Sequence, residues 1–191
     1  MNGRNARPQP SSTPPSSFFA GKVAFKFGDD INTDYIIPAS LLQEAWNKSF
    51  FAEHAFERYD PSFVETCRLN SSNGNIVLVA GKNFGCGSSR EQAVYAIQCN
   101  NIKAVIAESF PDIFYRNSIN NGFPALAVES TRDLQIGDRL SINLENLSLR
   151  KEESDLELKI SMTNGDRDSL LTGARLGAVK ERLRKRLLAT V

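Results

Sequence analysis

The sequence predicts an α/β fold in which a parallel βαβαβ unit is joined to a set of antiparallel strands. Residues 76–128 alternate short apolar runs with helical patterns, as the strands and crossover helices of a parallel sheet do. Residues 130–162 instead alternate apolar and polar side chains with period two, which is typical of antiparallel strands with one solvated face. The content of 41% hydrophobic and 24% charged residues suits an ordinary globular domain.

Residues 1–20 are expected to form a disordered tail before one folded domain, residues 21–191. Four of the eight prolines lie in this tail, among serines and without an acidic residue. Such a segment buries too little apolar surface to fold. The basic side chains of Arg4 and Arg7 also fit a targeting peptide, although no amphipathic helical pattern accompanies them.

Composition limits the function classes. The formal net charge of +1 gives no reason to expect nucleic acid or a membrane as a partner, and no apolar run approaches the ~20 residues that span a bilayer. The three cysteines lack a CxxC pair, so a reducing compartment is expected: the cytoplasm, or an organelle if residues 1–20 direct the chain there. Because His54 is the single histidine, the sequence predicts no metal or cluster site built from this chain alone.

Before residue 76 the expected elements are a strand, a turn and a helix. Apolar and basic residues alternate over 22–27 in the pattern of an edge strand, and the polar residues 28–34 form a turn. A helix is expected around residues 41–56, and a loop follows at 60–61.

The central region is expected to contain three strands and two helices. They lie at 76–80 (strand), 89–100 (helix), 104–108 (strand), 111–121 (helix) and 124–128 (strand). Ligands of parallel sheets bind beyond the carboxyl ends of the strands, where the loop after residue 80 and Ser109 both lie. Antiparallel strands are expected at 140–144 and 156–160. A basic amphipathic helix is expected at 170–188, and its charged face is either solvated or a contact for a partner or membrane.

Residues 81–91, between the first central strand and its helix, form the candidate site. Three glycines let the backbone bend sharply and approach a ligand closely. Ser88, Ser89 and Arg90 then fall at the start of the helix, where free N–H groups favour an anion. Arg90 can bind a carboxylate through a forked pair of hydrogen bonds, and together with the helix N-terminus it can stabilise a serine alkoxide that acts as a base. A capping box between Ser88 and Glu91 is expected at the same turn.

The same loop does not match three familiar glycine-rich templates. A dinucleotide fingerprint needs glycine where Arg90 stands, and a phosphate-binding P-loop needs Gly-Lys where the chain has Cys86 and Gly87. A nucleophile elbow centred on Ser89 needs glycine in place of Glu91. The loop is therefore expected to be a carboxylate or phosphate pocket that is none of these three known loop types.

Three segments, taken together in this order, resemble one family. They read DDINTDYIIP at 29–38, NFGCGSSRE at 83–91 and AVIAESFPDIFYRNSINNG at 104–122. Over about residues 20–180 the chain is similar to the small subunits of 3-isopropylmalate dehydratase, the separate swivel domain of the aconitase superfamily. The resemblance implies a swivelling β/β/α domain that closes over a larger, cluster-bearing subunit.

The resemblance also implies a reaction and a cofactor. The reaction is the loss and re-addition of water on a small hydroxy-dicarboxylate, which isomerises 2-isopropylmalate and 3-isopropylmalate in leucine biosynthesis. The enzyme is a hydro-lyase that is active only with the large subunit. A four-iron, four-sulfur cluster is expected on that subunit, held there by three cysteines, and no cofactor is expected on this chain.

Carried across by motif position, the resemblance marks six site residues. They are Ser88, Asp29 and Asp34 as catalytic residues, and Arg90, Ser89 and Gly87 as substrate-binding residues. Ser88 matches the base that removes the proton α to a carboxylate, and Arg90 matches a ligand of a substrate carboxylate.

Three departures from the family pattern leave alternatives open. Asp30 and Asn32 exchange the usual amide and acid, and Gln92 stands where histidine is usual. Residues 39–46, in the loop that helps to select the substrate side group, contain no arginine, and the next one is Arg58. A second carboxylate would need a cation there, so an apolar substituent is favoured. The alternatives are a paralogue acting on another 2-alkylmalate or on homocitrate or homoaconitate, and a non-catalytic anion-binding partner module.

Overall fold

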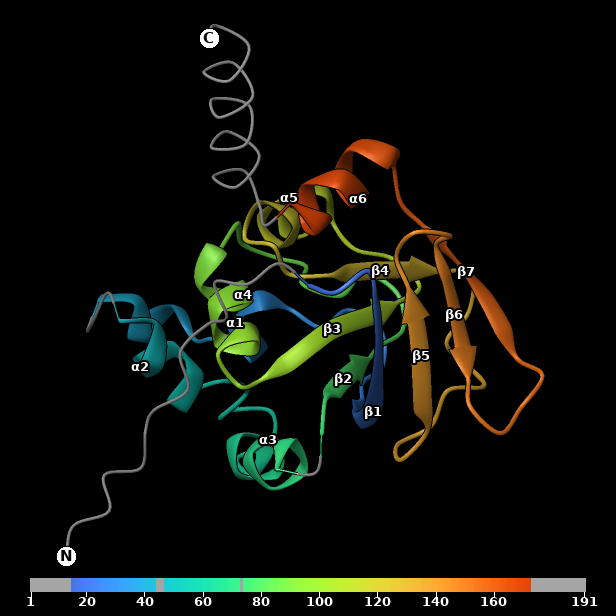
Figure 1. Ribbon diagram of the computed structural model, residues 1–191. Coiled ribbons are helices and arrows are strands. Elements are labelled where there is room, and N and C mark those ends of the chain that lie inside the picture. The colour runs from blue at the N-terminus through green and yellow to red at the C-terminus, as the bar shows by residue number, and fades with distance from the viewer. Residues whose placement is uncertain (1–14, 44–46, 73, 173–191) are drawn as a thin grey trace, which may run out of the picture.

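One seven-stranded sheet, closed into a barrel, organises the part of the chain that the computed structural model describes, residues 15–43, 47–72 and 74–172 (Figure 1). The strands are β1 (Phe18–Lys26), β2 (Ile76–Val79), β3 (Ile102–Ala107), β4 (Ala125–Val128), β5 (Arg139–Asn143), β6 (Ser148–Lys151) and β7 (Glu157–Ser161). The helices are α1 (Thr33–Ile36), the 3₁₀ helix η1 (Ala39–Gln43), α2 (Lys48–Glu53), α3 (Phe63–Ser71), α4 (Glu91–Gln98), α5 (Asp112–Asn120) and α6 (Asn164–Leu171).

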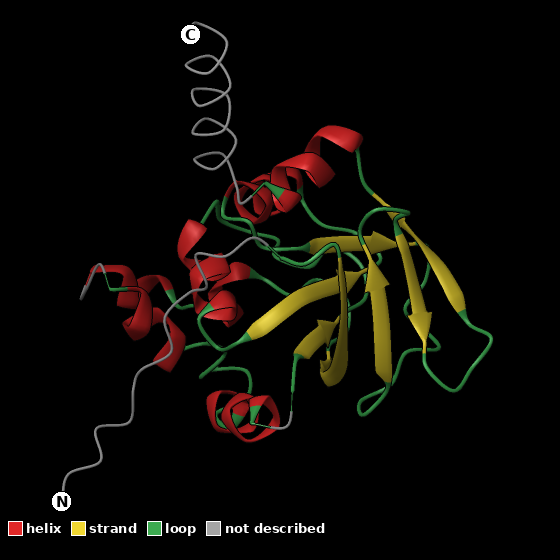
Figure 2. Cartoon of the chain, viewed as in Figure 1, coloured by secondary structure: helices red, strands yellow, loops and turns green. Residues whose placement is uncertain are grey.

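The barrel has a parallel half and an antiparallel half. Strands β1 to β4 pair in parallel in chain order, and β5, β6 and β7 pair antiparallel. Antiparallel pairs between β1 and β5 and between β4 and β7 close the sheet. Helices gather beside the parallel half, and β5 to β7 stand on the other side of the molecule (Figure 2). The predicted α/β fold, a βαβαβ unit with antiparallel strands attached, is confirmed.

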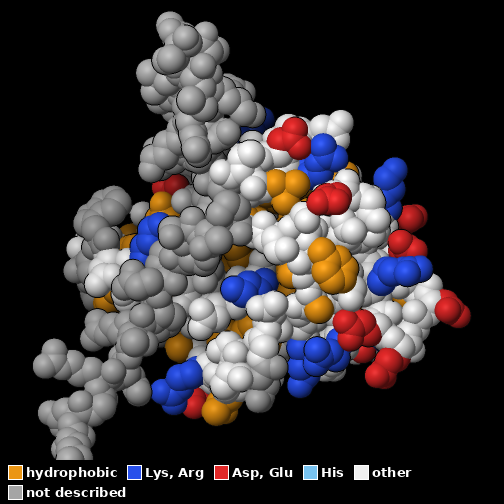
Figure 3. Space-filling view, in the orientation of Figure 1, with side chains coloured by type: hydrophobic (Ala, Val, Ile, Leu, Met, Phe, Trp, Pro, Cys, Tyr) orange, Lys and Arg blue, Asp and Glu red, His pale blue; other side chains and the backbone are white. Residues whose placement is uncertain are grey.

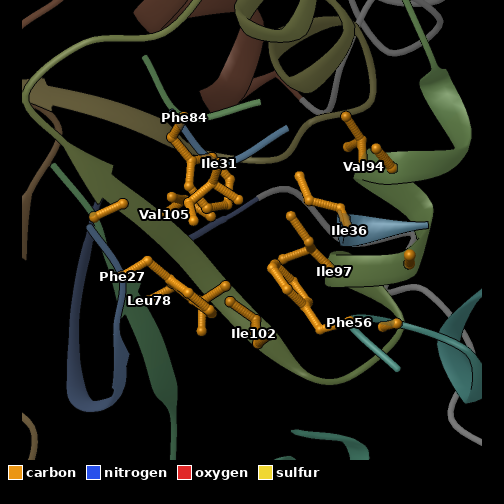
Figure 4. Packing of buried hydrophobic residues seen from close by; sticks show 14 of the residues in the cluster. Phe27, Ile31, Ile36, Phe56, Leu78, Phe84, Val94, Ile97, Ile102 and Val105 are labelled. Carbon is orange, nitrogen blue, oxygen red and sulfur yellow. The ribbon is translucent and has the colours of Figure 1, made fainter. Parts of the chain in front are cut away.

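Strand β2 is apolar at every position because it separates two hydrophobic cores. Ile76 and Leu78 pack in the core between the sheet and the helices, which is shown in Figure 4. Val77 and Val79 pack in the second core, inside the barrel. Successive side chains of a strand point to opposite faces, so a strand buried on both faces shows no polar alternation.

Strand β1 starts earlier than the sequence predicts. It begins at Phe18, so the last three residues of the expected 1–20 tail belong to the sheet, while residues 1–14 lie outside the described part of the chain. The reason is that β1 has two partners. Residues 18–22 pair antiparallel with β5, and residues 22–26 pair in parallel with β2. The mixed pattern of apolar and polar residues along β1 reflects these two pairing environments.

The prediction of one continuous helix around residues 41–56 is wrong. The 3₁₀ helix η1 ends at Gln43, α2 covers Lys48–Glu53, and residues 44–46 lie outside the described part. A new helix begins at Lys48 because the side chain of Asn47 accepts a hydrogen bond from the Ser49 N–H and caps it. Phe56 has φ +57°, a left-handed conformation that no helix can include.

The other predicted elements are confirmed within a few residues, and α1, α3, β6 and α6 are additional. Strand β6 was not expected because its sequence, Ser-Leu-Arg-Lys, buries only Leu149. It forms because it lies between β5 and β7 and pairs with both. Helix α6 begins where the Thr163 side chain accepts a hydrogen bond from the Asp166 N–H. Most of the basic helix expected at 170–188 lies outside the described residues.

Charges of both signs are interspersed on the antiparallel side of the face shown in Figure 3. Three ion pairs lie on β5 to β7 and their turns: Arg139 with Glu152, Arg150 with Glu157, and Lys151 with Asp138. The exposed pairs Arg139–Glu152 and Arg150–Glu157 each stabilise the fold by roughly 0–1 kcal/mol. No helix among the described residues is long and apolar enough to cross a membrane.

Candidate functional site

The loops at residues 28–33 and 81–88, which overlap the first two motif segments, lie side by side at one edge of the barrel. Strands β1 and β2 are adjacent and parallel, so the loops after them leave the sheet together. Five backbone hydrogen bonds join the loops: Gly81 N to Gly28 O (3.1 Å), Asp30 N to Lys82 O (2.8 Å), Gly85 N to Ile31 O (2.7 Å), Cys86 N to Ile31 O (3.1 Å) and Thr33 N to Cys86 O (2.8 Å). The two motifs therefore form one site.

The glycines of the loop permit close contact with the protein itself. Gly87 has φ +92°, and a Cβ added there would lie 2.6–2.9 Å from the side-chain amide of Asn32. Gly85 has φ +85°, and its added Cβ would overlap the Phe114 ring of α5. The expected need for glycine is confirmed, although the groups that approach the backbone here are neighbouring side chains.

Ser88 is exposed and is held at three atoms. Its backbone N–H donates to Thr33 Oγ1 at 3.2 Å, and the Thr33 hydroxyl donates to the Ser88 carbonyl at 3.2 Å. Its side-chain Oγ accepts a hydrogen bond from Arg90 Nη2 at 3.3 Å. Thr33 is buried, so the backbone of the serine is fixed while the hydroxyl faces outward. Ser89 and Gly87 are also exposed, on either side of Ser88.

The expected capping box is wrong. Helix α4 begins at Glu91, and Arg90 occupies the N-cap position with an extended backbone and no side-chain capping bond. The Glu91 carboxylate accepts a hydrogen bond from Asn121 Nδ2 at 2.8 Å instead of reaching back to Ser88. The box fails because Thr33 already binds the Ser88 N–H, and the helix starts two residues later than the box requires.

Arg90 and Asp34 form a forked ion pair across the two loops. Nη1 lies 2.6 Å from Asp34 Oδ1, and Nη2 lies 3.1 Å from Oδ2. Nη1 also donates to the Ile37 carbonyl at 3.1 Å, so together with the Ser88 contact all N–H groups of the two terminal nitrogens are engaged. The arginine side chain is only 11% exposed. Its hydrogen bond is the main reason that the pKa of Asp34 lies below its usual value.

Asp29 and Asp34, which the resemblance marks together, lie at opposite ends of the glycine loop. Asp29 Oδ1 accepts a hydrogen bond from the Lys82 N–H at 2.7 Å, and the Asp29 carboxylate would overlap a Cβ placed on Gly81. Asp34 instead holds Arg90, next to Ser88. Both acids therefore position the loop within this chain.

The exchange of Asp30 and Asn32 is accommodated because each position needs an oxygen acceptor. Asp30 Oδ1 accepts from Asn83 Nδ2 at 2.7 Å, and Asn32 Oδ1 accepts from the Asp34 N–H at 2.8 Å and caps α1. Amide and carboxylate oxygens both accept hydrogen bonds. Asp30 also has φ +57°, which aspartate and asparagine tolerate better than most residues.

Ser109 and Thr33 support the site but were not identified as site residues from the sequence. Ser109 Oγ accepts from the Asn83 N–H at 2.8 Å, and its carbonyl accepts from the Phe84 N–H at 3.1 Å. The segment after β3 therefore braces the glycine loop from the other side. The position of Ser109 after a predicted strand was a signal for the edge of the sheet, but not for this contact.

A comparison with known families decides the relationship. The family model of the aconitase C-terminal domain matches residues 21–131, which include both loops and Ser109. The chain belongs to the aconitase C-terminal domain family. Among relatives in this group, it is 48% identical over 126 residues to the 3-isopropylmalate dehydratase small subunit of Sulfurisphaera tokodaii, which covers 65% of this chain and 71% of the relative.

Two further comparisons agree with this aconitase C-terminal domain assignment. The chain is 42% identical over 138 residues to 3-isopropylmalate dehydratase small subunit 2 of Methanopyrus kandleri, which covers 71% of this chain and 79% of the relative. The crystal structure of 3-isopropylmalate dehydratase from Methanocaldococcus jannaschii matches with a TM-score of 0.79 and 35% identity, over 90% of this chain and 99% of that one. The family resemblance stated from the sequence motifs is confirmed.

Proposed function

We propose that this chain is the small subunit of a 3-isopropylmalate dehydratase, a hydro-lyase that interconverts 2-isopropylmalate and 3-isopropylmalate in leucine biosynthesis. The observation that carries this proposal is the exposed Ser88, whose hydroxyl Arg90 contacts and whose backbone Thr33 holds in place. The relatives whose names specify this activity support it.

Ser88 is the proposed base. As an alkoxide it takes the proton from the carbon α to a substrate carboxylate, and the C–H electron pair forms the carbon–carbon double bond. The C–O bond of the neighbouring carbon then breaks and its electron pair leaves with the hydroxyl group, which a proton from an acid group of the proposed large subunit converts to water. Addition of water in the opposite sense gives the isomer.

Arg90 favours the deprotonated state of Ser88. Its guanidinium donates to Ser88 Oγ, and a hydrogen bond from a cation stabilises an oxyanion more than a hydroxyl group. Asp34 and Asp29 act as positioning residues, the first on Arg90 and the second on the Lys82 N–H. For Arg90 to bind a substrate carboxylate as well, a substrate oxygen has to replace Ser88 Oγ or an oxygen of Asp34. Ser89 and Gly87, beside the base, are proposed substrate contacts.

The site needs a second subunit. Ser88, Ser89 and Gly87 are all exposed on this chain, whereas the proposed chemistry requires an enclosed substrate. The described residues bring together no group of three His, Cys, Asp or Glu side chains that could hold a metal ion. The four-iron, four-sulfur cluster that the resemblance implies does not fit this part of the chain, and we propose it for the large subunit.

The test is isomerisation of 2-isopropylmalate by the complex with the large subunit. We expect Ser88→Ala to lower kcat by at least about 10³-fold, because the proton-abstracting group is lost. Ser154→Ala, at an exposed serine in the turn before β7, is the matched control and keeps full activity.

Each other result has a clear meaning. Near-normal turnover by the Ser88→Ala complex would refute the assignment of the base. A preference for homoaconitate or another alkylmalate across a substrate series would identify a paralogue. A complex that assembles correctly but has no dehydratase activity would support the alternative that this chain is a non-catalytic anion-binding partner module.

A further inference from the structure

The guanidinium of Arg90 is largely committed within the protein. Both oxygens of Asp34, the Ile37 carbonyl and Ser88 Oγ accept its hydrogen bonds, and the side chain is 11% exposed. A substrate with two carboxylates therefore finds few unused donors on this arginine. A second cation near the site would serve such a substrate better.

Arg58 brings a second guanidinium to this edge of the site. Its Nη2 donates to the hydroxyl of Ser40 at 3.2 Å, although the two residues are 18 positions apart. Ser40 belongs to η1, whose first residue, Ala39, donates its N–H to Asp34 Oδ1 at 3.1 Å. A short series of contacts thus connects Ser88, Arg90, Asp34 and the η1 turn with Arg58.

The backbone around Arg58 is fixed by the fold. The Phe56 N–H donates to the Ile36 carbonyl of α1 at 2.9 Å, and the Phe56 carbonyl accepts from the N–H groups of Tyr59 and Asp60, each at 2.8 Å. Arg58 is one of the residues of this turn. The backbone of Arg58 is therefore held close to α1, and its guanidinium reaches Ser40 of η1.

The acids next to Arg58 in the sequence have other partners. The Glu57 carboxylate lies 2.6 Å from His54 Nδ1, and Asp60 Oδ1 accepts from the Ser62 hydroxyl at 2.6 Å. Within residues 15–43, 47–72 and 74–172, no ion pair of Arg58 is found. Arg58 is exposed, so its charge is available to a ligand.

Two further observations place Arg58 in the electrostatic and apolar surroundings of the site. Its positive charge helps to lower the pKa of Asp34, as a smaller contribution beside the Arg90 hydrogen bond. The neighbouring rings of Tyr35 and Tyr59 are each 46% exposed and meet edge to face at 5.5 Å. They offer an apolar surface next to a cation, as suits a dicarboxylate with an alkyl side group.

We infer that Arg58 is a specificity-determining residue that binds one carboxylate of the hydroxy-dicarboxylate substrate, with Ser40 holding its guanidinium in place. The inference rests on the proposed function. It also removes the argument that residues 39–46 favour an apolar side group because no cation is near them; the exposed rings of Tyr35 and Tyr59 are the observation that favours an alkyl side group. That segment has no arginine of its own, but the fold supplies one to it from residue 58.

Steady-state kinetics of the complex with the large subunit test this role. We expect Arg58→Ala to raise the KM for 2-isopropylmalate about 10- to 100-fold while kcat stays within about twofold, because a charge-assisted contact to bound substrate is lost. Arg58→Lys keeps the charge without the fork and should give an intermediate KM. Ser40→Ala should raise KM about two- to fivefold, since only the support of the guanidinium is removed.

The matched control is Arg68→Ala. Arg68 is an exposed arginine on α3 that pairs with Glu65 of the same helix, away from α1 and α4 in Figure 1. It should leave KM and kcat within about twofold. Equal KM values for Arg58→Ala and Arg68→Ala would overturn the inference, and so would a fall in kcat at unchanged KM.

An inhibitor separates this inference from the proposed function. 2-Isopropylsuccinate, a dicarboxylate without the hydroxyl group, should bind the wild-type complex about 10- to 100-fold more tightly than the Arg58→Ala complex in calorimetry. A wild-type complex that fails to isomerise isopropylmalate refutes the proposed function alone. Equal affinity of the wild-type and Arg58→Ala complexes for the inhibitor refutes the role of Arg58, whatever the turnover.

Discussion

Gly87→Ala tests how the glycine loop holds Ser88. The alanine must adopt φ +92°, which costs about 1–3 kcal/mol for a residue with a side chain. Its Cβ would lie 2.6 Å from Asn32 Oδ1, which caps α1 by accepting from the Asp34 N–H at 2.8 Å. If Asn32 shifts to relieve the contact, the cap is lost at about 1 kcal/mol. We therefore expect the free energy of unfolding to fall by roughly 2–4 kcal/mol.

Urea unfolding of the purified chain measures this change, and the assembled complex reports its effect on activity. Since Ser88 follows Gly87 directly, we expect kcat/KM to fall at least about 100-fold, as small displacements of reacting groups have effects of this size. The control is Gly165→Ala in α6, where the added Cβ meets only Thr163 Oγ1 at 3.9 Å. It should keep or slightly raise stability, because alanine favours helix.

A double variant separates the clash from the backbone strain. In the Asn32→Ala background the cap is already absent and the contact is removed, so Gly87→Ala should cost only the strain, about 1–3 kcal/mol. If the losses of unfolding free energy in Asn32→Ala and Gly87→Ala add fully in the double variant, the contact with Asn32 does not contribute to the cost of Gly87→Ala. A Gly87→Ala protein as stable as Gly165→Ala would refute the reasoning as a whole.

The remaining predictions concern the two acids that position the loop. For Asp34→Asn we expect a loss of roughly 0.5–1 kcal/mol in unfolding free energy near pH 7, since Asp34 is 48% exposed and solvent screens its pair with Arg90. The Arg90 hydrogen bond lowers the Asp34 pKa from 3.8, so the difference in unfolding free energy between wild type and Asp34→Asn should be constant above about pH 5 and vanish as the pH falls through the folded-state pKa. Urea unfolding between pH 3 and 7 measures this difference. A difference that grows in acid would contradict the prediction. For Asp29, Asn retains the oxygen that accepts from the Lys82 N–H, so Asp29→Asn should keep most of the kcat that Asp29→Ala loses. Equal kcat losses in the two Asp29 variants would instead indicate proton transfer by the carboxyl group.

The regular elements of the parallel half could be predicted from the sequence because their causes are local. Strand β2 is buried on both faces, so Ile76 to Val79 are all apolar, and the helices after it show the usual spacing of buried residues. Strand β6 and the break before α2 could not be predicted in this way. Strand β6 depends on pairing with both neighbours, and the break before α2 depends on the cap at Asn47; the left-handed Phe56, beyond the end of α2, keeps the helix from reaching residue 56.

For the site, the sequence by itself determined the motif, the family and the chemistry of its side chains. Its glycines, hydroxyls and Arg90 predict an anion site on local grounds, and the flanking motifs, through the family they resemble, make the anion a substrate carboxylate. Only the tertiary structure decided the partners of these groups. Asp34 lies 56 positions from Arg90 and Ser40 lies 18 from Arg58, and each pair meets because the fold brings separate loops to one edge of the sheet. Hydrogen-bond partners depend on such distances in space, which spacing along the chain does not determine.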